Sequence, residues 1–227
     1  MISNHLPTDY QTFIATSRYA RWIEDKGRRE TWSETVQRYT DYLHSKGINL
    51  TGQDWDDIEG AILELEVMPS MRALMTAGPA ADRDNTCIYN CSYVAVDHPR
   101  AFDEAMFILL CGTGVGFSVE RQAISQLPEI PASLANSDDL IVVQDSKEGW
   151  AKSLRKLISH LYTGDIPKWD LSKVRPAGSR LKTFGGRASG PEPLNDLFKF
   201  VVAKFKGAIG RRLNSIECHD IMCKIGE

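Results

Sequence analysis

The sequence predicts an α/β protein in which a helical N-terminal region is followed by strands that alternate with helices. Three observations carry this prediction. Apolar residues repeat at helical spacing early in the chain, β-rich runs begin after Cys87, and amphipathic stretches separate those runs. Strands joined by helices of such length form parallel or mixed sheets. We therefore expect a helical region over 1–78 and an α/β layer or an incomplete barrel over 79–227.

The first region contains two predicted amphipathic helices. Thr31 and Glu34 have the spacing of a capping box, and the helix that follows is expected to end at Gly47. A second helix is expected from about Asp54 to just before Pro69, because the residue before a proline disfavours helical backbone. These helices are expected to form a packing layer.

The second region shows a β-α-β rhythm that repeats. Asp145 and Glu148 are expected to form a capping box at the start of one crossover helix. Strands are expected over 88–96, 115–119, 140–143 and 169–174; helices are expected over 99–111, from 145 to 164, over 194–205 and from about 215, with a Gly-rich loop over 175–191.

Composition excludes several function classes. The 227 residues are 42% hydrophobic and 25% charged with a net charge of -3, which is typical of a globular protein and gives no broad basic field for nucleic acid. Neither a signal peptide nor a long apolar span is recognisable, so we expect no membrane partner and a cytoplasmic location, in a host if the gene is viral. The five cysteines are an odd number, which favours chemistry or metal binding over a disulfide framework.

Cys91 is the first candidate for chemistry. It follows Asn90 in Asn85-Thr-Cys-Ile-Tyr-Asn-Cys-Ser-Tyr-Val-Ala-Val96, inside a predicted strand. A strand cysteine is either a reactive thiol or a small apolar residue of the core, and the segment alone leaves both open.

Two glycine-rich segments are candidates for ligand binding. Cys111-Gly-Thr-Gly-Val-Gly-Phe-Ser-Val119 either presents backbone N–H groups to a phosphate or is a plain tight turn, and it lacks the P-loop lysine and the G-x-G-x-x-G spacing. Arg175 to Pro191 interleaves arginines with glycines, which suits an anionic ligand or a solvated surface loop.

Together these segments resemble the monomeric, adenosylcobalamin-dependent (class II) ribonucleoside-triphosphate reductases, including phage versions. The resemblance extends to Arg18-Tyr-Ala-Arg-Trp22, Asp145-Ser-Lys-Glu-Gly-Trp150 and Phe184-Gly-Gly-Arg-Ala-Ser-Gly-Pro191, and so covers nearly the whole chain. It implies that the chain is the N-terminal part of such an enzyme, with a helical layer and the first part of a ten-stranded α/β barrel.

The resemblance also implies roles for particular residues. Cys91 falls where the family keeps one of two cysteines that reduce the ribose and become a disulfide. Ser70, Asn90, Thr113 and Gly114 fall at the substrate. The effector and its specificity loop are expected at Asp97, Arg175, Gly178, Arg180, Gly185, Gly186, Arg187 and Ser189.

The departures from the family pattern shape the expected function. The Asn-Pro-Cys-Gly-Glu segment with the radical cysteine does not occur, and a second reducing cysteine is not identifiable. We therefore expect one reducing thiol plus substrate and effector loops, and no turnover by the chain alone. The resemblance implies a C-terminal companion chain, a thioredoxin-like reductant, a ribonucleotide substrate, a deoxynucleotide effector and adenosylcobalamin bound outside this chain.

Two alternatives belong to other classes. In one, the chain is an inert module that binds deoxynucleotides. In the other, Cys87-x3-Cys91 and Cys218-x4-Cys223, with His219 nearby, hold a structural zinc. Metal analysis and a thiol-dependent activity distinguish them.

Overall fold

The computed structural model describes residues 6–181 and 186–227. The chain divides into two compact units, Met1–Asn90 and Cys91–Glu227. The expected domains, 1–78 and 79–227, stay a prediction. Within the described ranges, no helix combines the length and apolar character needed to cross a bilayer.

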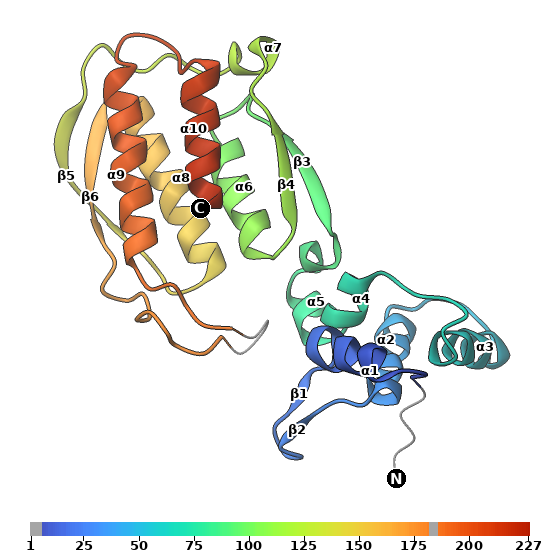
Figure 1. The fold of residues 1–227 in the computed structure, drawn as a ribbon. Coiled ribbons are helices and arrows are strands. Elements are labelled where there is room, and N and C mark those ends of the chain that lie inside the picture. Colours follow the sequence, from blue (N-terminus) through green and yellow to red (C-terminus); the bar gives the residue numbers. More distant parts are fainter. Residues whose placement is uncertain (1–5, 182–185) are drawn as a thin grey trace. The chain divides into compact units, whose positions relative to one another are not determined.

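The first unit is mainly helical, as predicted (Figure 1). The capping box of Thr31 and Glu34 is present at the start of α2, where each residue's side chain accepts a hydrogen bond from the other's backbone N–H. The elements are α1 (Asp9–Ile14), a π-helical turn (Ala15–Tyr19), an antiparallel pair β1 (Trp22–Ile23) and β2 (Arg28–Arg29), α2 (Trp32–Ser45), α3 (Gly52–Leu63), α4 (Met71–Thr76), α5 (Pro79–Arg83) and a 3-10 turn (Asn85–Ile88).

The second predicted helix, α3, is shorter than expected. It begins at Gly52 behind a capping box of Thr51 and Asp54, and it ends at Leu63 rather than just before Pro69. Leu65 has a φ of 62°, a left-handed conformation that ends helices and that most side chains avoid. The helix therefore ends five residues before Met68, the last residue before Pro69.

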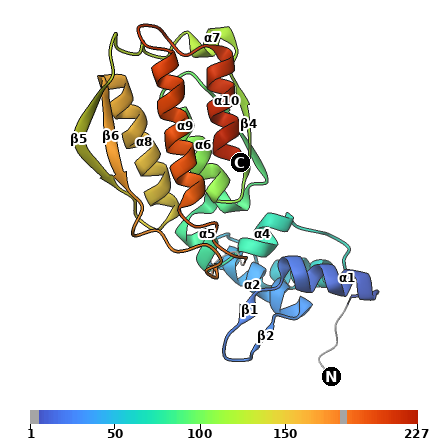
Figure 2. The same ribbon diagram turned by 60° about the vertical axis from the view of Figure 1, so that its left-hand side comes forward.

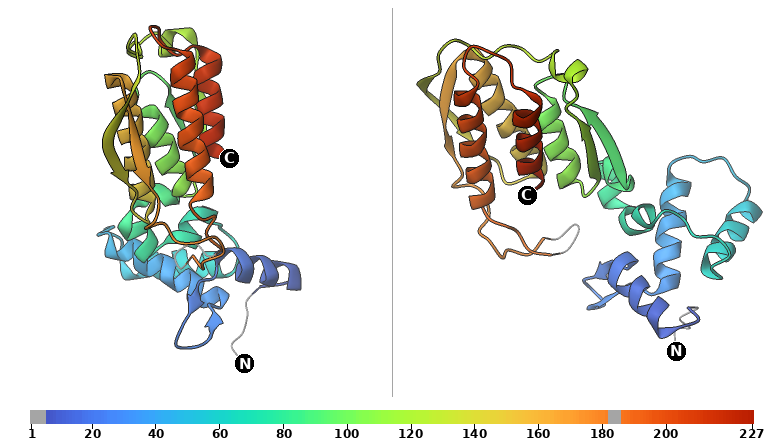
Figure 3. Two further views of the ribbon diagram at one scale, coloured as in Figure 1. Left: turned by 90° about the vertical axis from the view of Figure 1, so that its left-hand side faces the viewer. Right: turned by 45° about the horizontal axis from the view of Figure 1, so that its top comes forward.

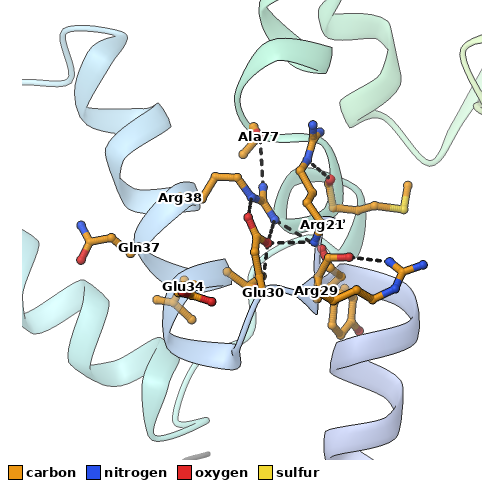
Figure 4. Close-up of polar contacts among 12 residues, drawn as sticks. Arg21, Arg29, Glu30, Glu34, Gln37, Arg38 and Ala77 are labelled. Carbon is orange, nitrogen blue, oxygen red and sulfur yellow. Dashed lines mark hydrogen bonds and ion pairs between the residues drawn. The ribbon is translucent and has the colours of Figure 1, made fainter. Parts of the chain in front are cut away.

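A buried ion pair ties the first unit together (Figure 4). Arg38 Nε lies 2.8 Å from Glu30 Oε1, and the two side chains are only 15% and 9% exposed. Arg38 Nη1 also donates to the carbonyl of Ala77, and Arg21 donates to the carbonyls of Met75 and Thr76. Burial lowers the pKa of Arg21, with the neighbouring Arg38 charge as the second cause. Arg21, in the Arg18–Trp22 motif, is thus bound to the end of α4.

The second unit contains two β-α-β units, which confirms the predicted rhythm. Strands β3 (Cys91–Ala95) and β4 (Gly114–Ser118) pair in parallel and are joined through α6 (Ala101–Leu110). Strands β5 (Ala135–Val142) and β6 (Asp165–Asp170) also pair in parallel and are joined through α8 (Lys147–Thr163). The remaining helices are α7 (Arg121–Ile124), α9 (Glu192–Gly207) and α10 (Ser215–Gly226).

The core of this unit is a helical layer between two small sheets. Helices α6, α8, α9 and α10 pack side by side (Figure 2), with β3–β4 on one side and β5–β6 on the other (Figure 3). The apolar faces of the helices meet there, and Trp169 packs edge-on against Phe198 with ring centroids 5.6 Å apart. Fully buried members of this core include Phe102, Leu154, Leu157, Phe198, Val201 and Ile221.

Three details of the second unit differ from expectation. The described strands form separate two-stranded sheets rather than one layer. Strand β5 is longer than 140–143, and β6 covers 165–170 instead of 169–174. The β5–β6 register shifts between Asn136 and Leu140 of β5. Pro167, which has no N–H to donate, lies opposite this shift on β6. A proline inside a short, polar run hid this strand from the sequence pattern.

The predicted capping box of Asp145 and Glu148 is wrong. Ser146 is the N-cap of α8, and its hydroxyl accepts from the backbone N–H of Gly149 at 3.0 Å. Ser146 has the extended backbone that an N-cap requires, so the helix begins one residue later than the predicted cap allowed. The Asp145 carboxylate is instead bound to Arg175.

Candidate active site

Cys91 and Gly114 lie opposite each other in the parallel pair of β3 and β4. Cys91 is exposed, so the reading of a buried apolar strand residue does not hold in this structure. The next residue, Ser92, donates its hydroxyl hydrogen to the Gly114 carbonyl at 3.1 Å. The register and this hydrogen bond together place Cys91 beside Gly114 of the glycine-rich segment.

The two faces of this strand pair have different characters. Alternation places Val94, Val115 and Phe117 against the helical core, whereas Cys91 and Tyr93 stand on the opposite face. Tyr93 is 68% exposed. Gly114 and Gly116 are the partners of Cys91 and Tyr93, so no side chains from β4 cover either residue at these positions. The thiol therefore stands beside bare backbone.

Gly112 belongs to a helix cap at the end of α6. Gly112 has a φ of 81°. Its N–H donates to the Leu109 carbonyl at 2.8 Å, and the Thr113 N–H donates to the Ile108 carbonyl at 3.2 Å. This is the pattern of a Schellman cap. The Gly112 and Thr113 N–H groups are bound to the helix, so the start of the segment is a tight turn.

Thr113 and Gly114 differ in exposure. Thr113 is 1% exposed, so its side chain belongs to the interior, while Gly114 is exposed at the first position of β4. Their proposed role as substrate contacts therefore rests on the Gly114 backbone beside Cys91.

Asp97 lies at the opposite end of β3 from Cys91. Six residues of extended chain span roughly 20 Å, which separates the two side chains along the strand. The Val96 N–H still donates to the Ser118 carbonyl at 2.9 Å, so the pairing persists to this end. An open pocket of about 490 Å³ lies alongside, lined by Tyr93, Phe117, Ser118, Val119 and Glu120.

Ser70 and Asn90 belong to the first unit. Ser70 is exposed at the N-cap position of α4 and makes no capping hydrogen bond with its side chain. Asn90 is exposed and immediately precedes Cys91 in the chain. Both stay predicted substrate contacts.

The predicted specificity loop is an antiparallel arm between β6 and α9. Residues Arg180 and Arg187 form an antiparallel bridge, and the Gly178 N–H donates to the Ala188 carbonyl at 2.8 Å. Gly178 and Gly186 have φ values of 85° and 84°, which only glycine adopts freely. The arm is therefore built from paired backbone in its described part, and Gly185 lies outside the described residues.

The arginines of the arm have distinct surroundings. Arg187 donates to the Gly178 carbonyl at 2.8 Å and so braces the arm. Arg175, at its base, holds Asp145 with 2.7 Å between Nε and Oδ2. Arg180 and Ser189 are exposed along its length. Figure 1 shows that the arm, the start of β3 and the end of α6 lie at the same end of this unit.

The other cysteines do not assemble a metal site in the described part of the chain. No three His, Cys, Asp or Glu side chains there are grouped to hold an ion. Cys218 is buried, which raises the pKa of its thiol to about 12, whereas Cys223 is exposed next to His219. The two α10 thiols thus face different surroundings, contrary to what the zinc alternative requires.

Lys147 makes a contact with the end of α6 that the sequence reasoning missed. Its ammonium donates to the Cys111 thiol at 3.0 Å and lies 5.0 Å from the centre of the Phe107 ring. The segment Asp145–Trp150 carried the only signal, as a stretch of family resemblance without an assigned role.

Comparison with known proteins identifies relatives for nearly the whole chain. Residues 126–204 match the family described as the insertion domain of B12-dependent ribonucleotide reductase. An adenosylcobalamin-dependent ribonucleoside-triphosphate reductase of Euglena gracilis is 30% identical over 92% of this chain and 31% of its own length. That of Lacticaseibacillus paracasei is 26% identical over 92% of this chain and 37% of its own.

The fold agrees with these sequence matches. A crystal structure of a B12-dependent (class II) ribonucleotide reductase superposes with a TM-score of 0.83 and 25% identity, over 94% of this chain and 39% of that one. The chain spans about a third of the length of the relatives it matches. The predicted resemblance is therefore confirmed: the chain is related, as a partial-length sequence, to the adenosylcobalamin-dependent ribonucleotide reductases, and its α/β fold class is that of the family.

Proposed function

We propose that this chain supplies one reducing cysteine, a substrate strand pair and an effector arm to a ribonucleoside-triphosphate reductase. The observation that carries the proposal is the exposed Cys91 thiol opposite Gly114, within a chain aligned over 92% of its length with such reductases. A thiol on bare backbone leaves room for a sugar to approach it. The exposed face of β3–β4 is the proposed place of the ribose.

The chemistry assigned to Cys91 is a two-electron reduction. Its thiol and a second cysteine together lose two electrons and become a disulfide, while the 2′ hydroxyl of the ribose leaves as water and C2′ gains hydrogen. The Gly114 carbonyl already accepts from Ser92, so this part of β4 is fixed while the thiol remains exposed. The role of this chain is to position the ribose beside one electron donor.

The arm is the proposed reader of a deoxynucleotide effector. Arg180, Arg187 and Ser189 offer hydrogen-bond donors on a backbone whose pairing keeps them at constant spacing. Asp97, at the other end of β3, stays a predicted effector contact. The similarity of residues 126–204 to the insertion domain of the family supports assigning the arm to the reductase rather than to an unrelated loop.

Adenosylcobalamin is named in the relatives. The family resemblance assigns none of its contacts to residues of this chain. We propose that the cofactor is held elsewhere in the reductase. A companion polypeptide carrying Asn-Pro-Cys-Gly-Glu and a thioredoxin-like reductant complete the proposed cytoplasmic enzyme.

The experiment is single-turnover reduction of a ribonucleoside triphosphate with adenosylcobalamin and a dithiol. The chain is assayed alone and mixed with a polypeptide that carries the expected remainder. Activity in the mixture, abolished by Cys91→Ser and retained by Cys223→Ser, supports the proposal. Absence of activity in the mixture, together with tight binding of a deoxynucleoside triphosphate by the chain, supports an inert nucleotide-binding module instead.

A further inference from the structure

One turn contacts both the effector arm and the segment that leads to the substrate strand. We call residues 144–149 the turn: they comprise the end of the connection from β5 to α8 and the first three residues of α8. Asp145 accepts from Arg175 at the base of the arm, with 2.7 Å between Oδ2 and Nε. Lys147 donates to Cys111 at the end of α6, with 3.0 Å between Nζ and Sγ. Cys111 is three residues before Gly114, which lies opposite Cys91.

The turn is a stiff connection. The Ser146 N–H donates to the Gln144 carbonyl at 2.9 Å, and the Val143 N–H donates to the Asp170 carbonyl at 3.0 Å. Gly149 is packed so closely that an added Cβ would lie 2.4 Å from the Gln144 carbonyl oxygen. The backbone on either side of Asp145 and Lys147 is therefore hydrogen-bonded and closely packed.

Lys147 occupies a position that helix electrostatics alone do not favour. It is the first residue of α8, at the positive end of the helix dipole, where a cation is destabilising. Its ammonium nevertheless lies over Cys111 and the ring of Phe107 instead of extending into solvent. The contacts with the buried Cys111 thiol and with the Phe107 ring favour this placement of the ammonium.

The two sides of the arm are closely packed at its base, which is also bound to the turn. An added Cβ on Gly190 would lie 2.9 Å from the backbone nitrogen of Ala177, so the two strands of the arm meet closely at its base. The Ala188 N–H donates to the Ser179 carbonyl at 2.8 Å. Arg175 directly precedes this closed base, and Asp145 holds it. The Arg175–Asp145 ion pair thus joins the base of the arm to the turn.

We propose that the 144–149 turn couples occupancy of the arm to the position of the 112–114 segment beside Cys91. Asp145 and Lys147 are positioning residues: one holds the arm and the other holds the end of α6. The inference rests on the proposed function, because that function assigns the effector to the arm and the ribose to the β3–β4 face. It adds the physical connection between them.

The first test measures nucleotide coupling in the full chain. Dissociation constants of ribonucleoside triphosphates are determined with and without each deoxynucleoside triphosphate, and their ratio gives a coupling factor. Lys147→Met and Asp145→Asn are expected to bring that factor close to one, while each nucleotide's own affinity changes by no more than about twofold. Lys147→Arg retains the cation and should retain the coupling.

A matched control separates coupling from general destabilisation. Lys168→Met removes a lysine that pairs with Asp138 at 2.7 Å across β5–β6, outside the proposed connection. It should leave the coupling factor unchanged. Wild-type coupling that survives Lys147→Met and Asp145→Asn overturns the inference and leaves the proposed function intact.

A second readout needs no nucleotide. Amide hydrogen exchange in residues 175–181 and 186–191 is expected to quicken in Lys147→Met but not in Lys168→Met, with the α8 core from Leu154 to Leu161 unchanged. If exchange in the arm is the same in both variants, the inference is wrong. Faster exchange in the arm of a chain that binds no nucleotide supports the connection and counts against the proposed function.

Discussion

Cys91 faces Gly114 across two parallel strands, and the missing β4 side chain leaves the thiol exposed. Gly114 has an ordinary strand conformation, since it is not among the glycines with positive φ. The backbone conformation at this position is therefore compatible with a side chain, which would project from the same face as Cys91.

Gly114→Val tests this arrangement. In a parallel pair, opposite residues project from the same face, so the valine methyl groups should screen Cys91. Alkylation of Cys91 by iodoacetamide, followed by peptide mass spectrometry, should slow several-fold, with Cys223 as the internal reference. Gly116→Ala, opposite Tyr93, is the matched control and should leave the rate unchanged. An unaltered Cys91 rate in Gly114→Val contradicts the assigned register.

The buried pair of Glu30 and Arg38 should be essential to the first unit. Glu30→Gln leaves Arg38 beside Arg21 without its counter-charge, which is expected to cost roughly 3 kcal/mol of unfolding free energy. Urea denaturation with hydrogen exchange across Trp32–Ser45 measures the loss. Asp82→Asn breaks the exposed pair with Lys46 and should cost only about 0–1 kcal/mol. Equal losses in the two variants would show that burial of the first pair is unimportant.

Gly149 should tolerate no side chain. Gly149→Ala brings a methyl group against the Gln144 carbonyl and should destabilise the second unit by roughly 1–3 kcal/mol. Gly207→Ala, at the end of α9, meets nothing within 4 Å and should be neutral or stabilising by up to about 1 kcal/mol. Thermal denaturation of both variants gives the comparison, and a neutral Gly149→Ala would refute the tight packing of the turn.

The sequence pattern predicted the elements whose signal is local. The Thr31 cap, the helices between strands and the two parallel units follow from spacing and periodicity, which the chain carries within a few residues. Strand β6 was misplaced because its pairing with β5, not its own apolar content, makes it a strand. Leu65 ends α3 through a left-handed backbone conformation, which cannot be predicted from a leucine in the sequence.

Site residues were predictable from the sequence to different degrees. Family resemblance singled out Cys91 and Gly114, and the register places them together. It could not reveal that the Gly112 and Thr113 N–H groups cap α6, since that depends on where the helix ends. Lys147 and Cys111 are 36 residues apart, so only the packing of α8 against α6 shows their contact.

Stability of the α10 start should depend on pH through Glu217. The Arg211 guanidinium, and then the Asn214 N–H, lower the pKa of this carboxyl. A depressed folded-state pKa gives stability that is present above the unfolded value of about 4.3 and lost as pH falls through the folded value. The protection factors of the α10 amides, which compare their exchange rates with those of an unstructured chain at the same pH, should therefore fall on acidification from pH 5. Glu217→Gln should show little of this dependence, whereas Glu129→Gln at the exposed Arg212 pair should retain it; identical pH profiles for all three proteins would contradict the assignment.

The oxidation state of Cys91 after one turnover tests the central claim most directly. The chain, its companion polypeptide, adenosylcobalamin and a ribonucleoside triphosphate are mixed without external reductant, quenched, alkylated and digested. The account predicts that Cys91 is recovered in a disulfide in an amount equal to the deoxynucleotide formed, while Cys223 is recovered alkylated. Deoxynucleotide formed with Cys91 still a free thiol would contradict it.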